Sequence, residues 1–133
     1  MCFFRKKKII SDELKYLLEG FGYIEDSKYK GRFEKKVSDI YSYTIIITDR
    51  IEFLICIDDK FELPETSHEI LVEKSEKLVE SLDTFCQWAE LGFEHIGFLL
   101  LKNVELDSNS IRNIENILLN LQELIADYLV ETK

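Results

Sequence analysis

The chain of 133 residues fits one domain of ordinary size, and it can bury a core without needing a metal ion or a disulfide. A hydrophobic content of 46%, with only five glycines and one proline, excludes a disordered chain. The net charge of −9 is divided unevenly: residues 1–36 carry ten Lys/Arg and six Asp/Glu, whereas residues 37–133 carry seven and twenty. Most of the negative excess lies in residues 58–94, with eleven acidic and three basic residues. We predict a single domain over residues 1–133 whose charge bears on its partners, not on its fold.

Cysteine usage and the N-terminal sequence predict a cytoplasmic protein. Three cysteines, an odd number without motif spacing, indicate a reducing compartment and not a disulfide framework. The basic run Arg5–Lys8 is not followed by the apolar segment of a signal peptide. The longest apolar runs, such as residues 97–101, are too short to span a bilayer. We therefore expect no contact with a membrane.

A short helix and a basic segment are predicted before the first clear strand. Ser11 is a good N-cap for a helix over residues 12–19, which Gly20 would end. An apolar face with helical spacing supports this helix, and its members are Ile10, Leu14, Leu17 and Phe21. Residues 24–37 are polar and basic, and we expect a loop with an edge strand at Arg32–Val37.

Residues 41–57 carry the strongest strand signal in the chain. Two runs alternate between two faces, and Asp49–Arg50 is a short link between them. This pattern predicts a β-hairpin. Its second face is also partly apolar, through Ile46, Leu54 and Cys56, so we expect the sheet to be covered on more than one side near its centre.

A long helix is predicted after the hairpin. Thr66 is its N-cap, and Glu69 three residues later completes a capping box. The helix is expected over residues 67–91, and Gly92 is a good stop. A buried strand is then expected at residues 95–101.

The last element and the order of the others define the fold class. Several cap residues from Asp107 onward precede a C-terminal helix predicted over residues 109–131. The expected fold is α+β, in the order α(β)ββαβα. A small, mainly antiparallel sheet of roughly three to four strands, with the central hairpin 41–57, would be packed by the long helix 67–91, the C-terminal helix and the short N-terminal helix.

Five carboxylates line one side of the predicted 67–91 helix. At about 100° per residue they fall within about 80° of arc, and they are Glu69, Glu73, Glu76, Glu80 and Asp83. We call this set the acidic ridge. The opposite side is an apolar stripe, and Trp88 lies on its flank. A solvated outer face explains the ridge without any function, whereas a docking surface for a basic partner protein, with Trp88 as an anchor, is the functional interpretation.

The C-terminal helix is more apolar than packing on one sheet requires. Its apolar residues cover about 140° of arc, against about 100° for a helix that lies on a sheet. They include Ile111, Ile114, Ile117, Leu118, Leu121, Leu124, Ile125, Tyr128 and Leu129. The additional surface could pack against the 67–91 helix, or it could form the interface of a homodimer.

Basic and aromatic residues are interleaved in residues 28–36. The candidate nucleic-acid contacts in this segment are Lys28, Lys30, Arg32, Phe33, Lys35 and Lys36. Cations and aromatic rings in this arrangement suit phosphate contact and base stacking. The chain as a whole is acidic, however, which is opposite to the usual basic footprint of a nucleic-acid-binding protein. Nucleic acid is therefore the alternative partner, and a solvated loop and strand edge is the simpler interpretation.

No residue pattern predicts an enzyme, a metal site or a cofactor. The two histidines are His68 and His95, and a Cys56–His95 nucleophile pair is the catalytic alternative to a buried thiol in mid-strand. Asp58 and Asp59 offer oxygen ligands for a divalent cation, although acidic loops usually face water. No glycine-rich loop follows a strand to cradle a phosphate. We expect no catalytic, metal or cofactor site.

The order of the elements resembles that of small acidic secretion-chaperone domains. The shared features are the N-terminal helix, the antiparallel meander and the terminal helix, over most of the chain. The resemblance implies a dimeric cytoplasmic protein that holds effector segments, although one strand after the 67–91 helix departs from the usual two-strand continuation. We predict a non-enzymatic protein-interaction domain (an inhibitor, an immunity protein or a chaperone-like protein) that presents the acidic ridge to a basic partner.

Overall fold

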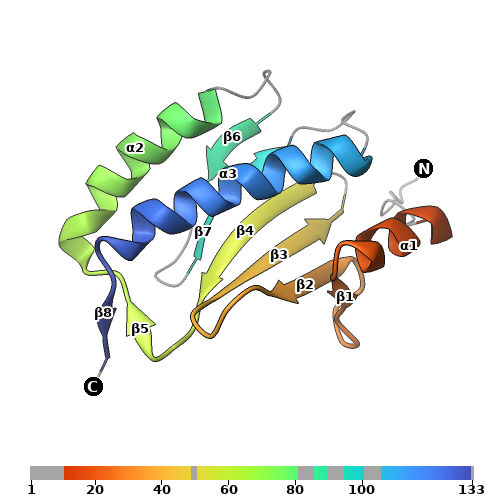
Figure 1. The fold of residues 1–133 in the computed structure, drawn as a ribbon, viewed down its shortest axis with the longest axis horizontal. Helices are drawn as coiled ribbons and strands as arrows, with labels where there is room; N and C mark the ends of the chain where they lie inside the picture. Colours follow the sequence, from red (N-terminus) through yellow and green to blue (C-terminus); the bar gives the residue numbers. More distant parts are fainter. Residues whose placement is uncertain (1–10, 49–50, 81–85, 90–94, 101–105, 133) are drawn as a thin grey trace, which may run out of the picture.

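The computed structural model of the protein describes residues 11–48, 51–80, 86–89, 95–100 and 106–132. The helices are α1 (Asp12–Gly20), the 3₁₀ helix η1 (Glu65–Ser67), α2 (His68–Glu80) and α3 (Ser108–Ala126), as Figure 1 shows. The strands are β1 (Ile24–Glu25), β2 (Arg32–Lys36), β3 (Tyr41–Ile47), β4 (Ile51–Ile57), β5 (Phe61–Glu62), β6 (Cys86–Ala89), β7 (His95–Leu100) and β8 (Val130–Glu131). None of the described helices is long and apolar enough to cross a membrane.

Six of the strands form one antiparallel sheet, which confirms the predicted α+β class. Their order is β1-β2-β3-β4-β7-β6, and β5 pairs with β8 in a separate two-stranded sheet. The hairpin predicted over residues 41–57 is confirmed, since β3 and β4 pair along their whole length. The strand expected near Arg32–Val37 is β2, but it is not the edge strand, because β1 pairs on its outer side.

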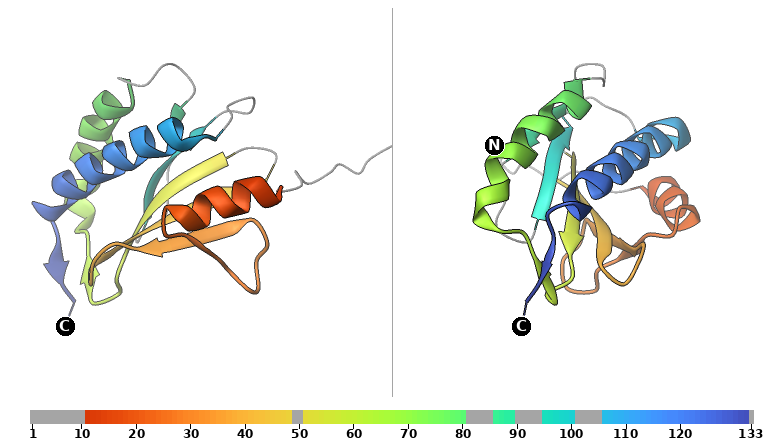
Figure 2. Two further views of the ribbon diagram at one scale, coloured as in Figure 1. Left: turned by 45° about the vertical axis from the view of Figure 1, so that its right-hand side comes forward. Right: turned by 60° about the vertical axis from the view of Figure 1, so that its left-hand side comes forward.

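The core lies between one face of this sheet and the three helices (Figures 1 and 2). Phe33, Ile45 and Phe53 are opposite one another on β2, β3 and β4, and each is at most 1% exposed. Each helix adds buried side chains to the same cluster, among them Leu18, Leu71 and Ile111. Full burial of a side chain of this size stabilises a fold by about 1.5–3 kcal/mol. This cluster therefore fixes all three helices on one side of the sheet.

On the opposite face of the sheet, the described part of the chain places no helix (Figure 2). Thr44 and Leu54, at the centre of that face, are nevertheless only 1% and 7% exposed. The low exposure of these two residues agrees with the prediction that both faces of the sheet are covered near its centre. No helix among the described residues provides this cover.

Capping and a left-handed turn fix α1 against β2. Ser11 Oγ accepts a hydrogen bond from the backbone N–H of Leu14 at 3.1 Å, as expected for the predicted N-cap. The chain leaves α1 through Gly22, whose φ of 99° favours glycine. A Cβ at this position would lie 3.0 Å from Lys35 Cδ. The turn brings Tyr23 close to Lys35, whose ammonium lies 5.0 Å from the centre of the ring.

The helix predicted over residues 67–91 is wrong at residues 86–89. α2 spans His68–Glu80, and residues 86–89 form β6, which pairs with β7. A short run of this kind is compatible with either a helix or a strand, and pairing with β7 decides between them. The expected N-cap also differs, because Thr66 lies inside η1. Gly92, the predicted stop, lies outside the described residues.

The helix predicted over residues 109–131 is α3, and its predicted end is wrong. Asp107 caps the helix by accepting a hydrogen bond from the backbone N–H of Ser110 at 2.8 Å. The helix stops at Ala126, and Val130–Glu131 pairs with β5 as strand β8. A strand of two residues carries no readable periodicity, so the apolar pattern favoured a longer helix.

Candidate functional site

Three carboxylates lie on the outer side of α2. Glu69, Glu73 and Glu76 are exposed, whereas Leu71 and Ser75 on the other side of the helix are 3% and 1% exposed. Among the described residues, none of the three takes part in an ion pair. We call Glu69, Glu73 and Glu76 the α2 carboxylates. They form a row of like charge that no base in the described part of the chain neutralises by direct contact.

The remaining residues of the predicted surface lie elsewhere or are not described. Trp88 was expected on the flank of the same helix, and this is wrong: it lies in β6, opposite Phe98 of β7. Glu80 is the last residue of α2, and Asp83 lies outside the described residues. The apolar residue that does accompany the carboxylates is Ile70, which is 42% exposed on α2. At about 100° per residue, Ile70 lies on the flank of α2, between the carboxylates and the buried side of the helix.

The wide apolar surface of α3 is used inside the chain. Its buried residues are Ile111, Ile114, Ile117, Leu118, Leu121 and Ile125. α2 packs against α3, and Ile117 shares one buried cluster with Leu71 of α2. Packing of the two helices therefore accounts for the apolar arc that one sheet does not need. A homodimer through this face stays a prediction.

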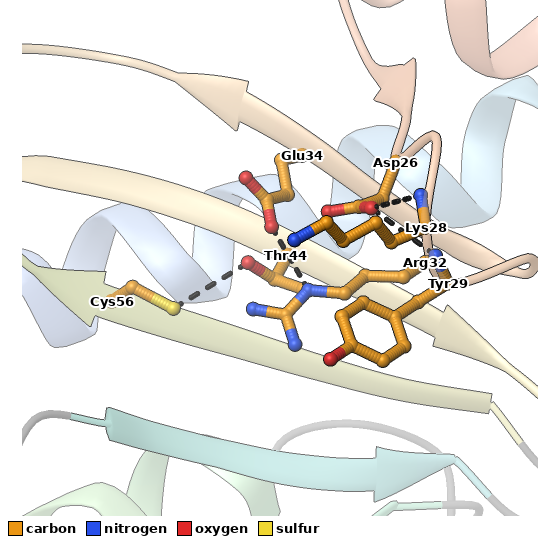
Figure 3. Close-up of polar contacts among 7 residues, drawn as sticks. All are labelled: Asp26, Lys28, Tyr29, Arg32, Glu34, Thr44 and Cys56. Carbon is orange, nitrogen blue, oxygen red and sulfur yellow. Dashed lines mark hydrogen bonds and ion pairs between the residues drawn. The ribbon is translucent and has the colours of Figure 1, made fainter.

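An ordered loop between β1 and β2 presents basic residues at the β1 edge of the sheet (Figure 3). Asp26 Oδ1 accepts hydrogen bonds from the backbone N–H groups of Lys28 at 2.7 Å and Tyr29 at 3.1 Å. These bonds hold the pKa of the Asp26 carboxyl below its ordinary value. Gly31, with a φ of 85°, donates its N–H to Glu25 Oε2 at 3.0 Å. The exposed end of this loop, which we call the β1–β2 tip, consists of Lys28, Tyr29 and Lys30.

Of the six candidate nucleic-acid contacts, two lie in the β1–β2 tip and four lie on β2, where they are divided between its two faces. Phe33 is 1% exposed and belongs to the core, so its ring is not available for base stacking. Lys35 lies on the helix side, where its Nζ pairs with Glu115 at 2.7 Å. Arg32 lies on the other face, where its Nε donates to Glu34 Oε2 at 2.9 Å (Figure 3). The exposed members of the set are Lys28, Lys30 and Lys36, together with Tyr29 between the first two in the tip.

A polar cluster joins the α1 turn and β2 to α3. Glu115 Oε2 accepts hydrogen bonds from Lys35 Nζ and from the Tyr23 hydroxyl, both at 2.7 Å. Lys35 Nζ also donates to the Phe21 carbonyl at 2.8 Å. Burial, and then the bond to Glu115, raises the pKa of Tyr23. The side chains of Lys35 and Glu115 are only 21% and 20% exposed, so the cluster connects elements of the fold and is not open to a partner.

A second tyrosine near this cluster gives a test in alkaline solution. Burial, and then the charge of Glu115, raises the pKa of Tyr43 from 10.0 to about 12. Because the folded pKa lies above the unfolded one, the neutral phenol stabilises the fold fully below about pH 10, and this contribution is lost as the pH rises toward 12. We expect the free energy of unfolding, measured with denaturant at stepped pH, to fall across this window. Tyr43→Phe should reduce the fall, whereas Tyr16→Phe, at a position 80% exposed, should not; identical curves for the two variants would contradict the assignment.

The catalytic pair considered from the sequence is brought together in the backbone register. Cys56 of β4 and His95 of β7 are directly opposite each other. Cys56 is half-buried, and its Sγ lies 3.4 Å from Thr44 Oγ1, with either atom able to donate (Figure 3). A half-buried thiol that contacts a hydroxyl in a neighbouring strand fits a structural role. The side chains of His95 and His68 lie outside the described part of the chain.

An open cavity of about 470 Å³ lies beside the β2–β3 turn. Its lining includes the carboxylates Asp26, Glu34 and Asp58. These groups already accept hydrogen bonds inside the chain, Glu34 from Arg32 at 2.9 Å and Asp58 from the Lys60 N–H at 3.1 Å. Within the described ranges, no group of three His, Cys, Asp or Glu side chains is placed to hold a metal ion. Local hydrogen bonds within the chain therefore account for these three carboxylates without a ligand.

No protein-family model, curated protein or solved structure significantly matches the chain. Function is therefore inferred from the two charged surfaces described above, the α2 carboxylates and the β1–β2 tip.

Proposed function

We propose that the protein is a non-enzymatic, cytoplasmic protein-interaction domain that binds a basic partner through the α2 carboxylates. The observation that supports this best is the row of Glu69, Glu73 and Glu76, which is exposed and has no ion pair among the described residues. A partner with lysines or arginines in a complementary arrangement would neutralise these charges. An inhibitor, an immunity protein and a chaperone-like holder of basic segments would each use such a surface.

The acidic surface continues from α2 toward the β5–β8 sheet. Glu65 of η1 and Glu62 of β5 are exposed and precede α2 along the chain. A partner that binds along α2 would meet these two carboxylates at the start of the helix. The pairing of β8 with β5, which the sequence did not predict, places Glu131 opposite Phe61 and therefore on the other face of this two-stranded sheet from Glu62.

Charge of this kind acts mainly on the rate of association. An acidic surface speeds the encounter with a basic protein, and the gain falls as salt is added. At about 0.15 M ionic strength the screening length is about 8 Å, so only groups near the contact matter strongly. Affinity also needs an apolar contact that is buried on binding, and Ile70, 42% exposed on α2, is placed to supply it.

Affinity capture with a charge-reversed variant tests the proposal. The wild type and the triple variant Glu69→Lys, Glu73→Lys, Glu76→Lys would be used as baits in extracts of the native cell, with quantitative mass spectrometry of the bound proteins. We expect a basic protein to bind the wild type and to be recovered at least about tenfold less on the variant, because attraction becomes repulsion. The three positions are exposed, so each substitution should change stability by about 0.5 kcal/mol or less.

A matched control distinguishes the effect of losing the α2 carboxylates from the effect of changing the net charge. Glu13, Glu19 and Asp39 are also exposed, and their replacement by lysine changes the net charge of the protein by the same amount. This control variant should capture the basic protein as the wild type does. Equal recovery on all three baits, or an equal loss on both variants, would show that the α2 carboxylates are not the binding surface.

A further inference from the structure

We propose that one partner of the α2 carboxylates is a second copy of this chain, which docks through its β1–β2 tip. The inference rests on the proposed function, because it uses the same carboxylates. It starts from the order of the strands, in which β1 is one edge of the sheet and β6, against which α2 packs, is the other (Figure 1). The basic tip and the acidic helix therefore lie at opposite edges of one molecule.

Hydrogen bonds within the chain hold the backbone of the tip. Asp26 Oδ1 receives the N–H groups of Lys28 and Tyr29, and the Asp26 N–H donates to the Arg32 carbonyl at 2.8 Å (Figure 3). The Arg32 N–H in turn donates to the Tyr29 carbonyl at 3.2 Å, which closes the turn. The Gly31 carbonyl accepts from the N–H of Ile47, so the loop is also tied to β3. A loop ordered in this way loses little conformational entropy on binding.

The side chains of the tip have the composition of a protein-binding surface. Tyr29 is 62% exposed between two exposed lysines, and residues 27–33 contain no acidic residue. Tyrosine gives a large contact area for the loss of few rotatable bonds, and it is enriched at the centres of interfaces. Ile70 on α2 offers an exposed apolar side chain beside the carboxylates. The two surfaces thus complement each other in charge and each carries one exposed apolar or aromatic side chain.

Two copies are needed because the surfaces cannot meet within one. Four strand-to-strand steps separate β2 from β6 in the sheet order, which is a distance of about 19 Å at the usual spacing. Contact between different surfaces of identical chains is heterologous, so it builds either a closed ring or an open assembly with one tip and one α2 surface unused at its ends. This differs from the homodimer predicted through the apolar face of α3, in which the two copies would use the same surface.

The net charge of −9 sets the conditions under which this contact forms. At low ionic strength two such molecules repel each other as whole bodies. At about 0.15 M salt the screening length is about 8 Å, so that repulsion is largely removed while charges in direct contact still attract. In about 1 M salt the screening length falls to about 3 Å, and the contact should weaken as well.

Sedimentation analysis with paired charge reversals tests the inference. At physiological salt and increasing concentration, we expect the average mass of the wild type to rise above the monomer mass of 15.7 kDa. Lys28→Glu/Lys30→Glu should weaken self-association at least about tenfold, and so should the reversal of Glu69, Glu73 and Glu76 to lysine. Each variant alone places like charges at the contact. An equimolar mixture of the two variants should associate again, because every tip then meets an α2 surface of opposite sign.

A control and an alternative partner complete the test. Lys36→Glu/Lys60→Glu makes the same change of charge at exposed positions outside the tip, and it should associate as the wild type does. A strictly monomeric wild type, or a mixture that does not associate, would overturn the inference. If a monomeric wild type still captures a basic protein through α2, the proposed function stands although the inferred self-association does not. The wild type could instead be monomeric and bind an oligonucleotide, with this binding abolished by Lys28→Glu/Lys30→Glu. That result would assign the tip to nucleic acid.

Discussion

Replacing Phe33 with alanine is expected to lower the free energy of unfolding by about 3–5 kcal/mol. The Phe33 ring is 1% exposed, and it lies opposite Ile45 on β3 in the cluster that also holds the helices. Alanine would remove most of that side chain and leave a cavity in a rigid environment, since the backbone of β2 is paired on both sides at this position. The large loss would identify Phe33 as a core residue and not as a ring for stacking bases.

Chemical denaturation of three proteins measures this effect. The wild type and Phe33→Ala are compared with Tyr29→Ala, which removes an aromatic ring that is 62% exposed. We expect the Tyr29 variant to lie within about 0.5 kcal/mol of the wild type. A loss below about 1 kcal/mol for Phe33→Ala would be incompatible with a buried ring at this position.

Glu115→Ala is expected to destabilise the protein by about 2–4 kcal/mol, although it removes a charged side chain from a chain with excess negative charge. Glu115 Oε2 is the acceptor for both the Tyr23 hydroxyl and Lys35 Nζ at 2.7 Å. Without it, Tyr23 keeps a hydroxyl at a position that is 1% exposed, and Lys35 retains the Phe21 carbonyl as its hydrogen-bond acceptor. Both groups would lose hydrogen bonds that water cannot fully replace.

Two further variants separate the lost hydrogen bonds from other causes. Glu123→Ala changes an exposed glutamate of the same helix, and it should change the free energy of unfolding by about 0.5 kcal/mol or less. The triple variant Tyr23→Phe, Lys35→Met, Glu115→Leu replaces the cluster by apolar groups and should recover much of the stability lost by Glu115→Ala. If Glu115→Ala and Glu123→Ala were equally stable in urea denaturation, the cluster would have no role in holding α3 to β2.

The parts of the fold that the sequence predicted correctly are those in which a local pattern is long. The hairpin 41–57 alternates over two full strands joined by a short link, and no helix fits that alternation. The start of α1 has a side-chain cap at Ser11, which acts within three residues along the chain. Both features are decided by near neighbours in the sequence.

The ends of α2 and α3 depend instead on partners that are distant in the sequence. Residues 86–89 form a strand because they pair with β7. Val130–Glu131 forms a strand because it pairs with β5. A pattern of apolar residues does not contain that information. The same reason explains why Trp88 was expected beside the carboxylates of α2 and lies in β6.

The candidate site could be predicted only in its local part. Spacing along one helix was enough to place Glu69, Glu73 and Glu76 on one side of α2. The division of residues 28–36 between the core and two surfaces follows from the pairing of β2 with β3. The pairing of Lys35 with Glu115 joins residues 80 positions apart, which no spacing rule indicates.

A photo-activated cross-linker placed on α2 tests directly whether a basic partner contacts the α2 carboxylates. The reactive group would replace Glu73 in one protein and Glu19 of α1 in the other, since both positions are exposed. After irradiation in the native cell, we expect the protein modified at position 73 to form a covalent adduct with a basic protein, and the protein modified at position 19 to form none. An adduct with the same protein from position 19, or none from position 73, would contradict binding through the α2 carboxylates.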